Sequence, residues 1–106
     1  MRRTVFYISD RTAITAETLG QSVLTQFEHI QFDQITLPFI DSIEKAKTAV
    51  EKINAANTEG NRPIIFSTLI DPDIRHEVMN SNGFFLDFFH SFIKLLEDEF
   101  HIESSH

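Results

Sequence analysis

Polar residues that can bind an anion gather near the start of the chain, at Ser9, Asp10, Arg11, Thr12 and Thr15. They follow a short apolar run and precede an amphipathic stretch, so we expect them in the turn between a strand and a helix. Such a turn places backbone N–H groups and hydroxyls around one point, and an arginine there can fork onto an oxyanion. The sequence therefore predicts a candidate phosphate, carboxylate or target-binding site in this turn.

A plainer interpretation competes with this one. Asp10, Thr12 and Thr15 are all competent helix N-caps, and caps of this kind are common. Ser67 and Thr68 end a later apolar run, and we expect them near the same edge of the sheet as the first turn. They join the candidate site, although isolated hydroxyls at strand ends are more often solvated than ligating.

The sequence offers no other catalytic chemistry, so we assign no catalytic residue and leave cofactor-binding residues open. The chain has three glycines, which build neither G-x-x-x-x-G-K-[ST] nor G-x-G-x-x-G, and it has no cysteine. Its five histidines lack metal-ligand spacing, so no metal site is predicted. Asp71 and Asp73 flank Pro72, where a helix cap is a better explanation than a metal pair.

Alternating strands and helices must position these residues. We expect strands at 4–8, 35–40 and 63–68, and Pro38 near the end of the second indicates an edge strand or a strand end. Helices are expected from Thr12 or Thr15 to residue 27, from Asp41 or Ser42 to 57, in a short segment from 72, and at about 84–101. The β-α-β-α-β-α-α order predicts an α/β, Rossmann-like single domain over residues 1–106. Its small three-stranded parallel sheet has order 2-1-3 and is flanked by helices.

The segment before the C-terminus is unusually rich in phenylalanine. On one helix, the apolar residues there would cover well over half of the circumference, more than a helix on one sheet face needs. The helix is either wedged in the core or presents an interface for a partner subunit or a further domain. The predicted interface residues are Phe84, Phe85, Phe88, Phe89 and Phe92.

Composition excludes several classes of partner. The 106 residues are 42% hydrophobic, so the chain should fold, and the net charge is −7. An acidic domain without a basic cluster is a poor binder of nucleic acid or of an anionic membrane. The apolar run after Arg3 is too short for a signal peptide or a membrane span, and the lack of cysteine fits the reducing cytoplasm.

Four blocks of the sequence, in order, resemble one protein family. They are VFYISDRTAITAETLG, ITLPFID, RPIIFSTLIDPDIR and DFFHSFIKLLEDEF. The chain is similar over nearly its whole length to the regulatory proteins of pyruvate, phosphate dikinase and phosphoenolpyruvate synthase. That resemblance implies a bifunctional enzyme, which phosphorylates a threonine of its target with ADP and removes the phosphate with inorganic phosphate, releasing pyrophosphate.

The resemblance also implies which part of such a protein this is. The family's nucleotide-binding P-loop lies in a C-terminal half, so we expect this chain to be an N-terminal domain that is inactive alone. ADP and phosphate would then belong to the longer protein, and no cofactor to these residues. The chain departs from the family pattern at Arg11, where the family has glycine, whereas Ser9, Asp10, Thr12, Thr15, Glu17 and Gly20 are retained.

An alternative from a different functional class stays open. The same features suit a non-catalytic domain in which the first turn senses an anion and the phenylalanine-rich segment forms a homodimer or another protein interface.

Overall fold

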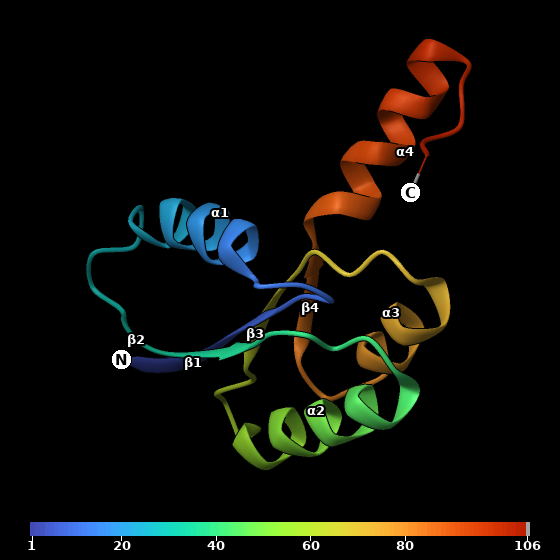
Figure 1. Cartoon of the computed structure of the whole chain (residues 1–106). Helices are drawn as coiled ribbons and strands as arrows, with labels where there is room; N and C mark the ends of the chain where they lie inside the picture. The colour runs from blue at the N-terminus through green and yellow to red at the C-terminus, as the bar shows by residue number, and fades with distance from the viewer. Residues whose placement is uncertain (106) are drawn as a thin grey trace.

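The first strand forms the centre of the sheet. A computed structural model describes residues 1–105, with all four strands parallel in the order β2-β1-β3-β4 (Figure 1). The elements follow one another as β1 (Arg2–Ile8), α1 (Ile14–Leu24), β2 (Gln31–Leu37), α2 (Ile43–Ala56), β3 (Ile64–Ser67), α3 (Pro72–Met79), β4 (Phe84–Asp87) and α4 (Phe88–Phe100). The predicted order 2-1-3 and the edge position of the second strand are confirmed.

The prediction of three strands is wrong, because a fourth strand lies beyond the third. Phe84 and Phe85, predicted to begin the last helix, lie in β4 and pair with Ile64 and Ile65 of β3. Gly83 permits this approach: a Cβ there would lie 2.5 Å from the Ile65 side chain. The chain can therefore turn close beside β3 and continue parallel to it.

Helices cover the two faces of the sheet unequally. On one face, α2 and α3 pack over Phe6, Ile8 and Ile65. On the other, α1 covers Val5, Tyr7 and Phe66, and Phe88 at the start of α4 packs against the same cluster. Figure 1 shows α1 on the opposite side of the sheet from α2 and α3. The part of the α1 face next to β4 therefore has less helical cover than the opposite face.

Local capping explains where two of the helices begin. Ser42 caps α2 by accepting a hydrogen bond from the Lys45 amide, and Asp71 caps α3 by accepting from the Asp73 and Ile74 amides. Pro72 then occupies the first turn, where its missing N–H has no cost. The cap interpretation of Asp71 is confirmed.

The last helix projects from the body of the molecule (Figure 1). Asp87 ends β4 and caps α4, accepting from the His90 amide, but no residue of α4 is buried. Within residues 1–105, no helix has the length and apolar character needed to span a membrane.

Candidate functional site

The predicted site residues meet at the carboxyl edge of the sheet, where the loops after β1, β2 and β3 converge. The Phe39 amide donates to the Arg11 carbonyl over 2.8 Å, and the Ile40 amide donates to the Ser9 carbonyl over 2.9 Å. The Thr68 amide donates to the Ile8 carbonyl over 3.0 Å, which ties the third loop to the first. The edge is therefore a single hydrogen-bonded surface rather than three independent loops.

Buried serines shape the turns that leave two neighbouring strands. Ser9 Oγ accepts from the Arg11 amide over 3.0 Å, and Ser67 Oγ accepts from the Leu69 amide over 3.1 Å. The description of Ser67 and Thr68 as solvated strand ends is wrong, since they are 0% and 2% exposed. Both serine hydroxyls instead hold the backbone of the candidate site in place.

The first turn of α1 contradicts the expected cap. The N-cap residue is Ala13, in the left-handed region at φ 72°, and no side chain among residues 1–105 caps the helix. Asp10, Thr12 and Thr15 were each predicted as possible caps, and none of them is. The leading amides of α1 therefore have no side-chain acceptor, and the positive end of the helix dipole is open to an anion.

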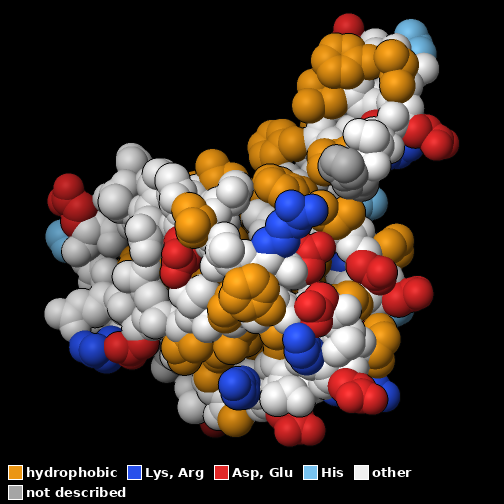
Figure 2. Space-filling model, viewed as in Figure 1, with side chains coloured by type: hydrophobic (Ala, Val, Ile, Leu, Met, Phe, Trp, Pro, Cys, Tyr) orange, Lys and Arg blue, Asp and Glu red, His pale blue; other side chains and the backbone are white. Residues whose placement is uncertain are grey.

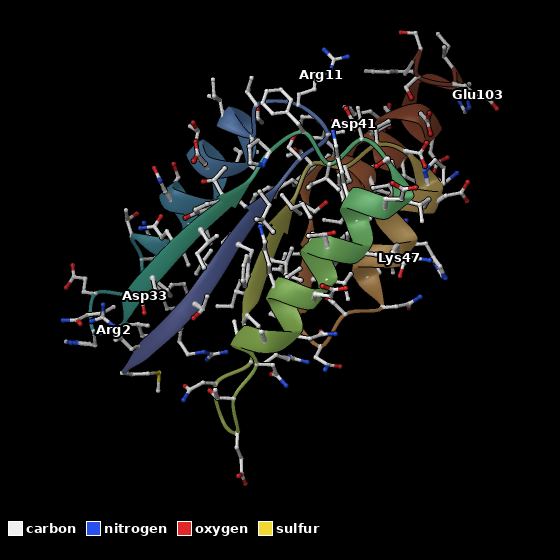
Figure 3. All side chains as sticks on the ribbon, turned by 60° about the horizontal axis from the view of Figure 1, so that its bottom comes forward. Arg2, Arg11, Asp33, Asp41, Lys47 and Glu103 are labelled. Carbon is white, nitrogen blue, oxygen red and sulfur yellow. The ribbon has the colours of Figure 1, made fainter. Side chains whose placement is uncertain are left out.

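Arg11 is the exposed cation of this turn. Its side chain extends from the same end of the sheet as Asp41, whereas Arg2 and Asp33 lie at the opposite end (Figure 3). The left-handed residue of the turn is Ala13 and not Arg11, so this backbone has no need of glycine at position 11. Thr12 and Thr15 are also exposed, and Asp10 is half-buried.

Polar contacts that the sequence did not reveal join β2 to α1 and to β1. Thr36 Oγ1 donates to the Glu17 carboxylate, and Tyr7 Oη donates to Gln34 Oε1 over 2.6 Å. Burial, followed by the charge of Glu17, raises the pKa of the Tyr7 phenol. Glu17 lies in the first of the four sequence blocks that resemble the family, and this was the one indication in the sequence that it has a role. Its contact gives it a positioning role for the helix that starts at the candidate site.

The five predicted interface residues lie in different environments. Phe88 stacks on Phe66 with ring centroids 5.3 Å apart, and the Arg62 guanidinium lies 4.7 Å above the Phe84 ring. Phe85 and Phe89 are half-buried, whereas Phe92 is 62% exposed. Phe92 is thus the member most available to a partner, and the interface itself stays a prediction.

One largely buried ion pair was not indicated by the sequence. Arg75 of α3 pairs through Nε with the Asp87 carboxylate at the end of β4, and their side chains are 19% and 9% exposed. The pair joins α3 to the start of α4. Elsewhere in residues 1–105, no group of three or more His, Cys, Asp and Glu side chains could hold a metal ion.

Comparison with known proteins gives this edge a family context. A family model described as kinase/pyrophosphorylase matches residues 5–106. Proteins of Pseudomonas fluorescens, Pseudomonas putida and Hahella chejuensis are 54%, 55% and 50% identical over 107 aligned positions, and each bears the provisional name phosphoenolpyruvate synthase regulatory protein. All of this chain is aligned, but it spans only 39% of the length of each relative. No solved structure matches.

The family match and the identities extend over the strand, turn and helix that form the open α1 terminus. This chain belongs to the kinase/pyrophosphorylase family.

Proposed function

We propose that this chain forms part of a regulatory protein that switches phosphoenolpyruvate synthase, or the related pyruvate, phosphate dikinase, by phosphorylating a threonine. ADP would be the phosphoryl donor. The reverse step would transfer that phosphate to inorganic phosphate and release pyrophosphate. The names of the relatives and the resemblance of the four sequence blocks support this assignment.

The observation that carries our proposal for this chain is the uncapped start of α1 beside Arg11. Amides at the start of α1 and a guanidinium on one exposed loop provide hydrogen bonds and positive charge for a phosphate group. The Asp10 carboxylate, half-buried in the same loop, would repel a bound anion. The positive charge of Arg11 therefore has to offset the negative charge of Asp10.

We assign a binding role rather than the phosphoryl-transfer chemistry to these residues. Phosphoryl transfer depends on groups that cradle the nucleotide phosphates and neutralise their charge. The three glycines of this chain build no phosphate loop. The open edge would form one wall of a cleft, contacting the phosphorylated threonine or inorganic phosphate.

The direct test uses the purified chain, ADP and phosphoenolpyruvate synthase. We expect no phosphorylation of the target by this chain, whereas the longer relative from Pseudomonas fluorescens phosphorylates it under the same conditions. Measurable phosphorylation by the chain alone would show that the chemistry resides here. Failure of the longer relative would contradict the assignment of target and donor.

The binding role has its own test, by titration calorimetry with inorganic phosphate. Arg11→Ala should weaken phosphate binding by at least about tenfold, because a charge-assisted hydrogen bond contributes roughly 1.5–3 kcal/mol. The matched control is Lys47→Ala, which removes an exposed cation from α2. Equal weakening by both variants would mean that phosphate responds only to net charge.

A second function is favoured by the projecting helix. A non-catalytic anion sensor that pairs with another protein through its last helix would also need an open α1 terminus and an exposed α4. Phosphate binding by this chain, with no effect on a longer relative's phosphorylation of its target, would support this alternative.

A further inference from the structure

A groove lies beside β4, one of the two edge strands of the sheet. Its volume is about 550 Å³, and its lining is mainly apolar. Its walls come from four elements outside β4 as well as from β4 itself, and include Val23, Phe66, Met79, Leu86, Phe88 and Phe92. We call this the β4 groove. Val23, Met79 and Phe92 are each more than 40% exposed, so the rim of the groove is apolar as well.

The apolar surface continues along α4. Leu95 is 65% exposed and lies one helical turn beyond Ser91 and Phe92, which line the groove, so it extends the same face. Leu96 and Phe100 widen the stripe and are 51% and 61% exposed. Figure 2 shows hydrophobic side chains exposed over the projecting helix.

A helix in this position needs a partner. Isolated helices of 13 residues are marginal in water, and most helical stability in proteins comes from packing an apolar face. α4 contains no buried residue, yet its stripe is as apolar as a core-facing helix requires. Within residues 1–105, the core cluster on the sheet face beneath the groove includes helical residues from α1 and, from α4, Phe88 alone.

We propose that the β4 groove and the α4 stripe are the surface on which the rest of the polypeptide packs in the longer members of the family. The relatives align with all of this chain over 39% of their own length, so most of each relative lies outside the aligned part. Covalent connection gives that additional segment a high local concentration at the end of α4.

A second copy of this chain is a poorer occupant. Each copy has a net charge of −7, and α4 presents Glu97, Asp98 and Glu99 against the single cation Lys94. Bringing two such helices together opposes like charges along the rim, which disfavours a symmetric contact.

Hydrogen exchange of the α4 amides tests this proposal without ADP or the target enzyme, so its outcome is independent of the proposed function. In the 106-residue chain, we expect exchange close to that of a free helix at every protein concentration. In the full-length Pseudomonas fluorescens relative, the equivalent amides should exchange at least about tenfold more slowly, because they open only when the packed segment leaves.

Substitution in the longer relative locates the contact. Serine at the position aligned with Leu95 should restore at least about tenfold faster exchange, since it places a polar side chain in the proposed apolar contact. Serine at the position aligned with Lys94, which in this chain is exposed and pairs with Asp98, should leave the rates within about twofold. Because Leu95 is exposed in this chain, the variant should still fold.

Two results would overturn the proposal. Equal exchange of α4 in the short chain and in the longer relative would mean that nothing covers it. Protection that appears in the short chain and grows with its concentration would identify a second copy as the occupant.

Discussion

At the residue scale, Gly20 shows how one missing side chain fixes the distance between helix and sheet. A Cβ at this position would lie 2.5 Å from the Tyr7 ring and 2.8 Å from the Phe66 ring. Gly20→Ala should therefore lower the free energy of unfolding by about 1–3 kcal/mol, despite the roughly 1 kcal/mol by which alanine favours a helix.

Urea unfolding measures this change. Thr18→Ala, at an exposed position on the same helix, is the control and should stay within about 0.5 kcal/mol of the original chain. An alanine at position 20 that stabilised the protein would show that α1 can move away from the rings at no cost.

Tyr7 should make the protein sensitive to alkali. Below its ordinary pKa of 10.0, the phenol is protonated in both the folded and the unfolded state. Its burial therefore contributes fully to stability in that pH range. Because folding raises the pKa of this phenol, the tyrosine of the unfolded chain ionises first as the pH rises above 10. The free energy of unfolding therefore falls over that range. Tyr7→Phe should flatten this part of the curve, while losing about 1 kcal/mol at neutral pH with the hydrogen bond to Gln34.

The measurement is direct because the chain contains one tyrosine. Ultraviolet absorbance follows its ionisation without interference from other tyrosines, and urea unfolding between pH 7 and 11 follows the stability. A phenol that titrates at or below pH 10 in the folded protein would contradict the burial argument.

At the element scale, Asp87 joins three parts of the fold. It ends β4, caps α4 and pairs with Arg75 of α3. Asp87→Ala should lower the free energy of unfolding by about 3–5 kcal/mol, because it leaves the Arg75 charge largely buried without a partner and removes a cap. Chemical denaturation tests this, with Asp41→Ala, which removes an exposed partner of Lys45, expected to change little. Equal effects of the two substitutions would mean that Arg75 finds water instead.

The same element shows where sequence pattern succeeds and where it stops. Strand and helix alternation up to α3 was predictable, because each apolar run was short and bounded by turn residues. The structure of the run FFLDFFHSF was not predictable, because the spacing of its apolar residues fits a strand and also fits one face of a helix. Asp87, an N-cap three residues before His90, was the signal that divides it.

The candidate site was partly predictable for a related reason. Ser9, Arg11 and Thr68 could be placed at one edge because parallel strands bring their carboxyl ends together. The open terminus of α1 could not be predicted, since alanine has no preference for the left-handed backbone that Ala13 adopts there.

At the scale of the whole molecule, stability should reside in the body rather than in the projecting helix. Ile53, on the face of α2 that packs in the core, is fully buried, whereas Leu95 is 65% exposed. In this chain, Ile53→Ala should lower the free energy of unfolding by about 2–5 kcal/mol, and Leu95→Ser should change it by less than about 0.5 kcal/mol. Thermal or urea unfolding of the two variants provides the comparison. A large loss from Leu95→Ser would mean that the stripe packs within this chain after all.

The strand order also has a consequence for synthesis on the ribosome. The first strand to emerge becomes the centre of the sheet, the second adds to one side of it, the third to the other, and the fourth beyond the third. No strand has to insert between two that are already paired, so the sheet can grow outward as translation proceeds. Each newly emerged strand finds its partner already in place, which shortens the time that an unpaired edge is exposed to other nascent chains.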